Sequence, residues 1–306
     1  MNLNPQNQLN LYGVEENLRT LIALYDKGNL PSKILLTGQK GVGKCTLAYH
    51  LINYILSKDE EFSYNINEFK IYSKNRSFKL ITNGTNPNFQ LLDVSIDKKQ
   101  INIDQIRNLL LNIKKSSFND KPRFILIDNI EYLNKNSVNA LLKDLEEPNE
   151  NIYFILINNQ RKLISTLKSR CLNFNISLSN ETSLKVINQL MGDDIFDHVN
   201  NELINYYFTP GNIYNLNKFA IENEINLKDM KLKEFLKKMI KENYFKKDQN
   251  FKYLFYDYLE LFLKNISSID NMDYYSYFVK KIDNIKKYNL DEESLFIEFN
   301  EKILNG

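Results

Sequence analysis

The sequence is short of the residues that build cross-linked or linker-rich proteins. Its 306 residues include two cysteines, six prolines, nine glycines and no tryptophan. Two cysteines, Cys45 and Cys171, exclude a disulfide framework and a four-cysteine zinc site. No long Gly/Ser/Pro-rich linker interrupts the chain. This composition is typical of a protein in a reducing cytoplasm, and we expect it to carry no zinc.

Long hydrophobic runs and an excess of one charge are also missing. The longest apolar runs, such as Phe154 to Ile157, have the length of a strand and are far too short to span a membrane. Residues 1–12 are rich in Asn and Gln without an apolar core, so we expect no secretory signal there. The 40 basic and 38 acidic residues give a net charge of +2, so no global field favours nucleic acid or a membrane. The 43% hydrophobic content is that of an ordinary globular protein of two or three domains.

The first half of the chain alternates apolar strands with amphipathic helices. Such alternation predicts an α/β fold with a parallel sheet covered on both faces, ending near Ile176. After Ser177 the pattern is helical, with a turn predicted at Pro210-Gly211, and from Leu227 onward it is also rich in aromatic residues. The aromatic residues from Phe251 to Phe262 favour a core or a subunit interface over a base-stacking surface. The predicted strands cover 33–37, 89–94, 123–128, 152–158 and 172–176, and the predicted helices 44–56, 104–115, 136–147 and 180–191.

A phosphate-binding loop follows the first predicted strand. The sequence Gly38-Gln39-Lys40-Gly41-Val42-Gly43-Lys44-Cys45-Thr46 matches G-x-x-x-x-G-K-[ST] except at its last position. In this motif the glycines let backbone N–H groups close around phosphate oxygens, the lysine reaches the terminal phosphates, and the hydroxyl binds magnesium. Cys45 replaces that hydroxyl, and a neutral thiol is a poor magnesium ligand. Thr46 is rotated by about 100° around the helix and does not simply replace it.

The strand Phe124 to Asp128 ends in an acid of the kind that holds magnesium beside phosphates. The alternative is an Asp that only caps a turn, but the upstream phosphate loop favours the first interpretation. Hydrolytic proteins of this architecture usually have Glu at the next position to orient the attacking water. Here that position is Asn129, whose amide cannot accept a proton, and Glu131 lies two residues further on.

Two further motifs make the chain resemble clamp-loader subunits of the AAA+ family, nearest to their bacterial delta-prime type. The helix reads Asn-Ala-Leu-Leu-Lys-Asp-Leu-Glu-Glu-Pro over 139–148, and a later segment, 166–171, contains Ser169-Arg170-Cys171. The resemblance covers residues 11–176. It implies an AAA+ phosphate-loop domain over 1–177, a small helical lid domain over 178–226 and an all-helical collar domain over 227–306. It also implies that Arg170 acts as an arginine finger in the ATP site of a neighbouring subunit.

Departures from the family pattern argue against hydrolysis by this chain. The second-sensor arginine of active members should follow Pro210-Gly211, where the chain has Asn212, Ile213 and Tyr214. Residues 55–88 lack the four cysteines of the zinc ribbon found in many members. Asn158 or Asn159 remains a candidate first sensor. The resulting nucleotide site comprises Gly38, Gly41, Gly43, Lys44, Cys45, Thr46, Asp128 and Asn158, with no metal and with at most weakly bound ATP or ADP.

The resemblance predicts a non-hydrolysing or weakly hydrolysing subunit of the DNA polymerase III clamp loader. Its expected partners are the other subunits of a hetero-pentamer, the sliding clamp and primed DNA, with no membrane. An ATP-hydrolysing subunit of the gamma/tau or replication-factor-C type is the main alternative. A stand-alone AAA+ nucleic-acid remodeller would leave the two clamp-loader motifs unexplained. The lysine-rich stretch 228–247 could touch DNA, although a solvated helix surface is the favoured interpretation.

Overall fold

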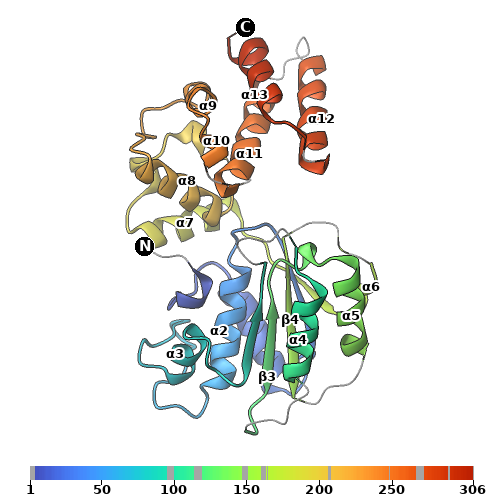
Figure 1. Cartoon of the computed structure of the whole chain (residues 1–306). Helices are drawn as coiled ribbons and strands as arrows, with labels where there is room; N and C mark the ends of the chain where they lie inside the picture. The colour runs from blue at the N-terminus through green and yellow to red at the C-terminus, as the bar shows by residue number, and fades with distance from the viewer. Residues whose placement is uncertain are drawn as a thin grey trace. The chain divides into compact units, whose positions relative to one another are not determined.

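The computed structural model divides the chain into two compact units, Met1–Ser179 and Asn180–Gly306 (Figure 1). The structure describes residues 4–94, 100–113, 119–146, 151–159, 163, 165–205, 208–247, 249–266, 272–288 and 290–305. The end of the first unit lies close to the predicted end of the sheet domain at 177.

The first unit is built on a parallel five-stranded sheet. Its strands are β1 (Lys33–Thr37), β2 (Phe89–Leu92), β3 (Arg123–Ile127), β4 (Ile152–Asn158) and β5 (Leu172–Asn175), in the order β2-β3-β4-β1-β5. Every neighbouring pair is parallel, which confirms the predicted α/β fold. Since parallel strands end at the same edge, the segments after β1, β2, β3 and β4 meet at the carboxyl edge of the sheet.

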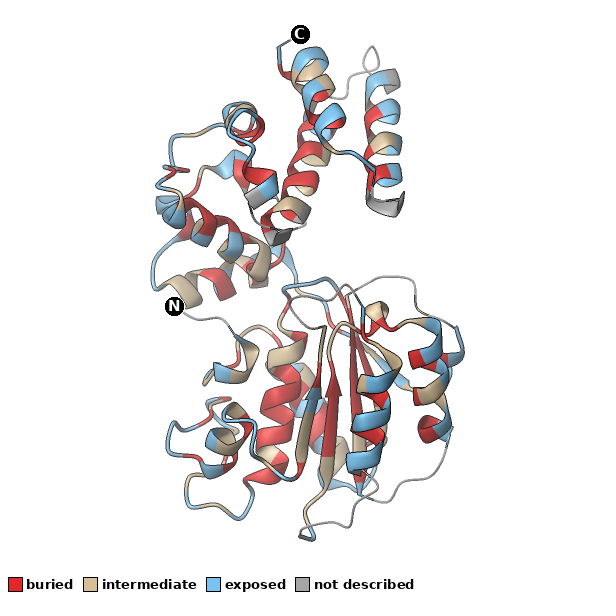
Figure 2. Cartoon of the chain, in the orientation of Figure 1, coloured by how far each residue is buried: buried red, intermediate tan, exposed pale blue. Residues whose placement is uncertain are grey.

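Helices cover both faces of this sheet (Figure 1). One core packs α1 (Glu15–Asp26) and α2 (Lys44–Leu56) on alternate strand residues such as Leu36 and Phe124. The other core packs α4 (Ile103–Ile113), α5 (Lys135–Glu146) and α6 (Ser165–Lys168) on the opposite side chains, such as Leu35. Figure 2 shows the buried residues gathered along the strands and the helix sides facing them. The continuous apolar runs of the strands therefore reflect burial on both faces.

The helix α2, which follows the phosphate loop, is buried on nearly all sides. Two elements pack on α2. One is the segment that leads from α2 to the helix α3 (Arg76–Thr82), and the other is the short 3-10 helix η1 (Pro5–Asn7). Two polar side chains of α2 are consequently buried and bonded. The His50 ring nitrogens lie 2.9 Å from the Tyr64 hydroxyl and 3.2 Å from the Gln8 carbonyl, and Asn53 donates to Asn75 at 3.0 Å. These contacts fasten the segment after α2 to the helix.

The second unit consists of helices joined by turns and loops in the residues described there, with one isolated β-bridge between Val199 and Leu227. Its elements are α7 (Asn180–Met191), η3 (Ile195–Asp197), η4 (Asn201–Leu203), α8 (Pro210–Glu222), α9 (Leu232–Lys241), α10 (Tyr244–Lys247), α11 (Gln249–Ile266), α12 (Met272–Tyr288), α13 (Glu293–Phe299) and a π-helical turn, Asn300–Leu304. Pro210-Gly211 begins α8 instead of forming a separate turn, because proline fits the first helical position and Thr209 caps the helix. None of the helices that the structure describes is long and apolar enough to cross a lipid bilayer.

A single hydrophobic core runs through the second unit. It extends from Ile187 to Leu304, and the stacked rings of Phe219 and Phe251 lie 3.7 Å apart across the predicted lid–collar boundary at 226. These two rings pack together although one lies in the predicted lid domain and the other in the predicted collar domain. Phe251 and Phe262 are buried in this core, as predicted for the aromatic segment.

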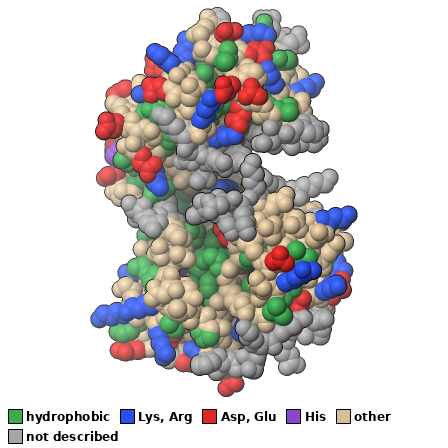
Figure 3. Space-filling view, viewed as in Figure 1, with side chains coloured by type: hydrophobic (Ala, Val, Ile, Leu, Met, Phe, Trp, Pro, Cys, Tyr) green, Lys and Arg blue, Asp and Glu red, His purple; other side chains and the backbone are tan. Residues whose placement is uncertain are grey.

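The lysine-rich stretch 228–247 carries ion pairs on the surface. Lys228 pairs with Asp197, and Lys246 pairs with Glu293. Figure 3 shows basic and acidic side chains interspersed on the visible face of this unit. This arrangement is typical of a solvated surface.

Candidate functional site

The phosphate loop connects β1 to α2 at the carboxyl edge of the sheet. Gly38, Gly41 and Gly43 have φ angles of 153°, 90° and 94°. A Cβ atom on Gly38 would lie 2.1 Å from the Ile176 carbonyl oxygen, so only glycine fits there. The sequence motif thus produces the close backbone turn that a phosphate cradle requires.

Lys44 is folded back onto its own loop. Its side chain is buried, and its ammonium donates hydrogen bonds to the carbonyls of Gly38 (2.8 Å) and Gln39 (2.6 Å). Burial lowers the pKa of Lys44 to about 8, and the nearby carboxylates of Asp128 and Glu131 oppose this shift. A phosphate entering the loop therefore has to compete with two carbonyls for the ammonium.

Cys45, in the first turn of α2, lies beside the acid at the end of β3. The half-buried Cys45 thiol lies next to the Asp128 carboxylate, and burial, followed by that carboxylate, raises the pKa of the thiol well above its usual value. Cys45 therefore stays a neutral thiol. Thr46 is also half-buried, but Cys45 is the side chain that contacts Asp128.

Asp128 lies in an environment that favours its protonated form. Burial and then the neighbouring Asp93 carboxylate raise the pKa of Asp128 to about 6, against hydrogen bonds from the Asn129 N–H and the Cys45 thiol. A carboxyl group so placed resembles a magnesium ligand in position, while its charge is disfavoured in the absence of a cation.

A chain of side-chain hydrogen bonds links the ends of β2, β3 and β4. The Asn129 amide donates to Asp93 at 2.8 Å and accepts from the Asn159 amide at 2.8 Å. Asn129 has φ = 56°, a left-handed conformation that asparagine tolerates. The residue at the water-orienting position is thus fixed between two neighbours, and neither end of its amide can act as a base.

The structure brings together most of the predicted nucleotide-site residues and adds Asp93. Asn158 ends β4 opposite Thr37 and is buried, whereas Asn159 is the one that bonds to Asn129. Sequence reasoning misses Asp93, although its place directly after β2 could have identified it, because the ends of parallel strands converge.

The Ser169-Arg170-Cys171 segment lies between α6 and β5. Ser169 Oγ and Arg170 Nη1 both donate to the Thr166 carbonyl, at 3.1 and 2.8 Å. Arg170 Nε donates to Glu146 Oε1 at 2.9 Å, and Nη2 bonds to the same oxygen. Burial raises the pKa of the Cys171 thiol to about 11, and this side chain packs against the core. Each residue of the motif therefore shapes this turn.

Arg170 and the phosphate loop lie at opposite edges of the sheet. Leu172, the first residue of β5, pairs with Ile34 of the parallel strand β1. The four steps from Ile34 to Gly38 span about 13 Å at about 3.3 Å per residue, and Arg170 precedes Leu172 by two residues. Held by Glu146 and Thr166 at the amino edge, Arg170 does not belong to its own chain's phosphate site.

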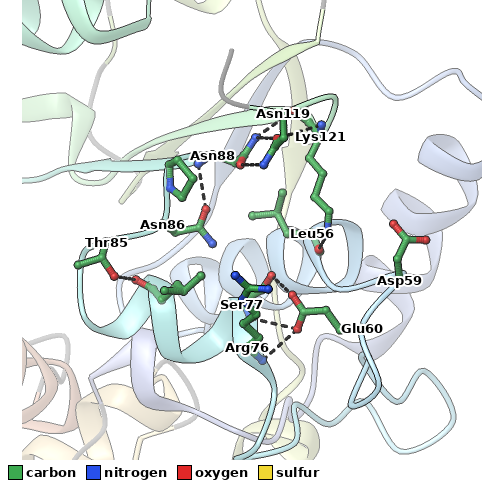
Figure 4. Close-up of a pocket in the computed structure, with 12 residues that line it drawn as sticks. Leu56, Asp59, Glu60, Arg76, Ser77, Thr85, Asn86, Asn88, Asn119 and Lys121 are labelled. Atoms are coloured by element: carbon green, nitrogen blue, oxygen red, sulfur yellow. Dashed lines mark hydrogen bonds between the residues drawn. The ribbon is translucent and has the colours of Figure 1, made fainter. Parts of the chain in front are cut away.

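A separate cleft of about 550 Å³ lies beside the end of α2 remote from the phosphate loop (Figure 4). Its polar groups bond largely to one another. Glu60 accepts from the Arg76 and Ser77 N–H groups and the Ser77 hydroxyl, while Asn88 and Asn119 exchange amide hydrogen bonds. Lys121 donates to the Leu56 carbonyl at 2.7 Å. These bonds tie the end of α2 to the segments around the cleft.

Two other predicted features concern metals and the second sensor. Within the ranges that the structure describes, no cluster of three or more His, Cys, Asp or Glu side chains is placed to hold a metal ion. Asn212 and Ile213 lie in the first turn of α8, where the Asn212 N–H bonds to the capping Thr209 hydroxyl and Ile213 is buried. These positions serve helix capping and the core. Glu147 and Pro148, which complete the helix motif, lie outside the described residues.

Known proteins are similar in sequence to the part of the chain that carries these sites. The sequence model of the family described as DNA polymerase III, delta subunit, matches residues 13–180. The chain is 33% identical to DNA polymerase III subunit delta' of Pseudomonas aeruginosa over 138 residues, 45% of this chain and 40% of that protein. It is 29% identical to DNA polymerase III subunit gamma of Buchnera aphidicola subsp. Schizaphis graminum over 234 residues, 74% of this chain and 62% of that protein. The chain thus spans about half the length of these curated relatives.

A solved structure also shares the fold. The gamma subunit-related DNA polymerase III protein of Thermotoga maritima superposes with a TM-score of 0.54 at 18% identity, covering 92% of this chain and 96% of that one. At this identity the likeness concerns the fold alone, and it includes residues of both units.

Proposed function

This chain belongs to the family described as DNA polymerase III, delta subunit, and on that premise we propose that it is a delta-prime-type subunit of a clamp loader. In this role it hydrolyses little or no ATP and donates Arg170 in trans to the ATP site of a neighbouring subunit. Its partners are the other subunits of a hetero-pentameric loader, the sliding clamp and primed DNA within the complex.

The position of Arg170 is the observation that carries this proposal. The residue lies at the amino edge of the sheet, while the phosphate loop of the same chain lies at the carboxyl edge. An arginine that stabilises phosphoryl charge must reach the phosphate, and this one can do so only in another subunit. An arginine finger contributes roughly 10³–10⁵ in rate because a planar cation meets the charge that develops in the transition state.

The chain's own nucleotide site supports the second half of the proposal. Cys45 and Asp128 lie next to each other where a hydroxyl and a carboxylate would hold magnesium, and Asn129 is fixed where a base would orient water. The loop still offers backbone N–H groups and Lys44, so ATP or ADP would bind weakly at most. We propose no zinc and no resident metal for this site.

Two measurements test the proposal. A tagged chain purified from its native cells should carry other DNA polymerase III subunits with it, whereas a homo-oligomer alone would contradict the assignment. The isolated chain should show no significant ATPase activity. Turnover of about 1 s⁻¹ or more, abolished by Lys44→Ala, would favour the alternative of a hydrolysing subunit of the gamma/tau or replication-factor-C type. Two observations favour this alternative: the Asp93 carboxylate lies beside Asn129, and the match to a gamma subunit is the longer one.

A further inference from the structure

We propose that Glu146 is the positioning residue for Arg170, holding the guanidinium in the orientation in which it is presented to a neighbouring subunit. This inference rests on the proposed function and adds a second residue to the same site. Glu146 is the last residue of α5, and Arg170 lies two residues before β5. The pair therefore links the end of α5 to the segment before β5, which lies beyond β4 and α6 along the chain.

The contacts of Arg170 fix the plane of its guanidinium. Nε and Nη2 both bond to Glu146 Oε1, and Nη1 donates to the Thr166 carbonyl at 2.8 Å. A guanidinium held on two sides by a carboxylate and a carbonyl cannot rotate without breaking at least one charge-assisted hydrogen bond. An arginine without these contacts would sample many rotamers and lose entropy on meeting a phosphate.

These contacts leave donors for a phosphate. A guanidinium has five N–H groups, and the three bonds use one on each nitrogen. One N–H therefore remains on Nη1 and one on Nη2, and both are available to phosphate oxygens. The Arg170 side chain is 32% exposed, so the contacts hold it without enclosing it.

The pair contributes to orientation more than to folding. Glu146 is 55% exposed, and ion pairs at such exposed positions contribute little to stability. A change at Glu146 should leave the fold intact and alter only where the arginine points. A small displacement of a catalytic group suffices to lower a rate substantially.

The test uses the loader reconstituted from this chain and the subunits that co-purify with it. Clamp loading and the KM and kcat of the DNA-stimulated ATPase are measured for Glu146→Ala, Glu146→Gln, Arg170→Ala and the double variant Glu146→Ala/Arg170→Ala. Asp104→Asn is the control, because it removes another exposed carboxylate–arginine pair, Asp104–Arg107, from the same unit. Thermal unfolding of each isolated chain checks that it folds.

We expect Glu146→Ala to lower the clamp-loading rate about 10-fold, because it displaces a catalytic group. The kcat of the ATPase should fall with it, while the KM for ATP stays unchanged. Glu146→Gln should lose less, because its amide oxygen can still accept from Arg170. In the Arg170→Ala background Glu146→Ala should add nothing, since both changes remove the same positioned group.

Other outcomes separate the inference from the proposed function. Wild-type loading by Glu146→Ala with impaired loading by Arg170→Ala would overturn the positioning role alone. Faster loading by Glu146→Ala would show that the carboxylate competes with the phosphate, and an additional loss in the double variant would show that it acts elsewhere. Either result overturns the inference. Wild-type loading by Arg170→Ala would overturn the proposed function as well.

Discussion

The Cys45 thiol lies next to the Asp128 carboxylate, so that the two positions that hold magnesium in the phosphate-loop motif face each other here. This proximity is built into the fold, because Cys45 is the second residue of α2 and Asp128 directly follows β3 at the same edge of the sheet. A cation at this point would have to displace a neutral thiol that offers it little in return.

Nucleotide binding should therefore depend little on magnesium. We expect ATP or ADP to bind weakly to the isolated chain, with calorimetry giving nearly the same affinity with and without the metal. Cys45→Thr restores the usual hydroxyl and should introduce a magnesium dependence, while Cys171→Ser serves as the control at the other cysteine. Tight, strictly magnesium-dependent binding by the wild-type chain would show that Thr46 or Asp128 compensates for Cys45.

Asp128 should make the protein less stable as the pH rises from about 4 to 6. Its pKa is raised from 3.8 to about 6 in the folded chain, so the folded state holds a proton across this window that the unfolded state has lost. At pH 7 the ionised, buried group costs about 3 kcal/mol. Asp128→Asn keeps a similar shape without the charge.

The measurement is the free energy of unfolding in denaturant for both chains between pH 4 and 7. Asp128→Asn should be the more stable chain at pH 7, with its advantage shrinking towards pH 4. An advantage that stays constant with pH would contradict the assigned burial cost.

His50 should have the opposite effect in a similar window. Burial lowers its pKa from 6.5 to about 4, so the unfolded chain binds a proton there that the folded chain does not. The stability lost as the pH falls from about 6.5 to 4 is about 3 kcal/mol. His50→Gln should remove this loss from the unfolding curves measured across the same pH range. His198→Gln, at the chain's other and exposed histidine, should leave the acid sensitivity unchanged, and equal effects of the two substitutions would refute the explanation.

The sequence predicts the sheet and the phosphate loop closely because local signals determine both. The predicted bounds Lys33–Thr37 and Lys44–Leu56 match β1 and α2, since glycines punctuate the chain between them. The predictions for β2, β3 and β5 run one or two residues too far. The N–H groups of Asp128 and Ile176, the residues that follow β3 and β5, still bond to the carbonyls of Leu92 and Thr37 on the neighbouring strands, so these strands end gradually at the carboxyl edge.

The contacts that define the site are less accessible to sequence reasoning. The bonds Asn129–Asp93, Asn159–Asn129 and Arg170–Glu146 join residues 36, 30 and 24 positions apart. Such pairs depend on strand order and on the length of each helix, which local patterns do not fix. The packing of Phe219 on Phe251 is a further long-range contact that local patterns do not predict.

The central claim is that this chain donates an arginine and does not use its own phosphate site for hydrolysis. The most direct test compares Arg170→Ala and Lys44→Ala in the same reconstituted loader, by DNA-stimulated ATPase and clamp loading. We predict that Arg170→Ala lowers the ATPase rate partially and the clamp-loading rate further. Arg170→Lys should restore these rates poorly, because an ammonium lacks the planar fork of a guanidinium. Lys44→Ala should leave both rates near those of the wild type. Loss of activity with Lys44→Ala, and wild-type rates with Arg170→Ala, would contradict the account.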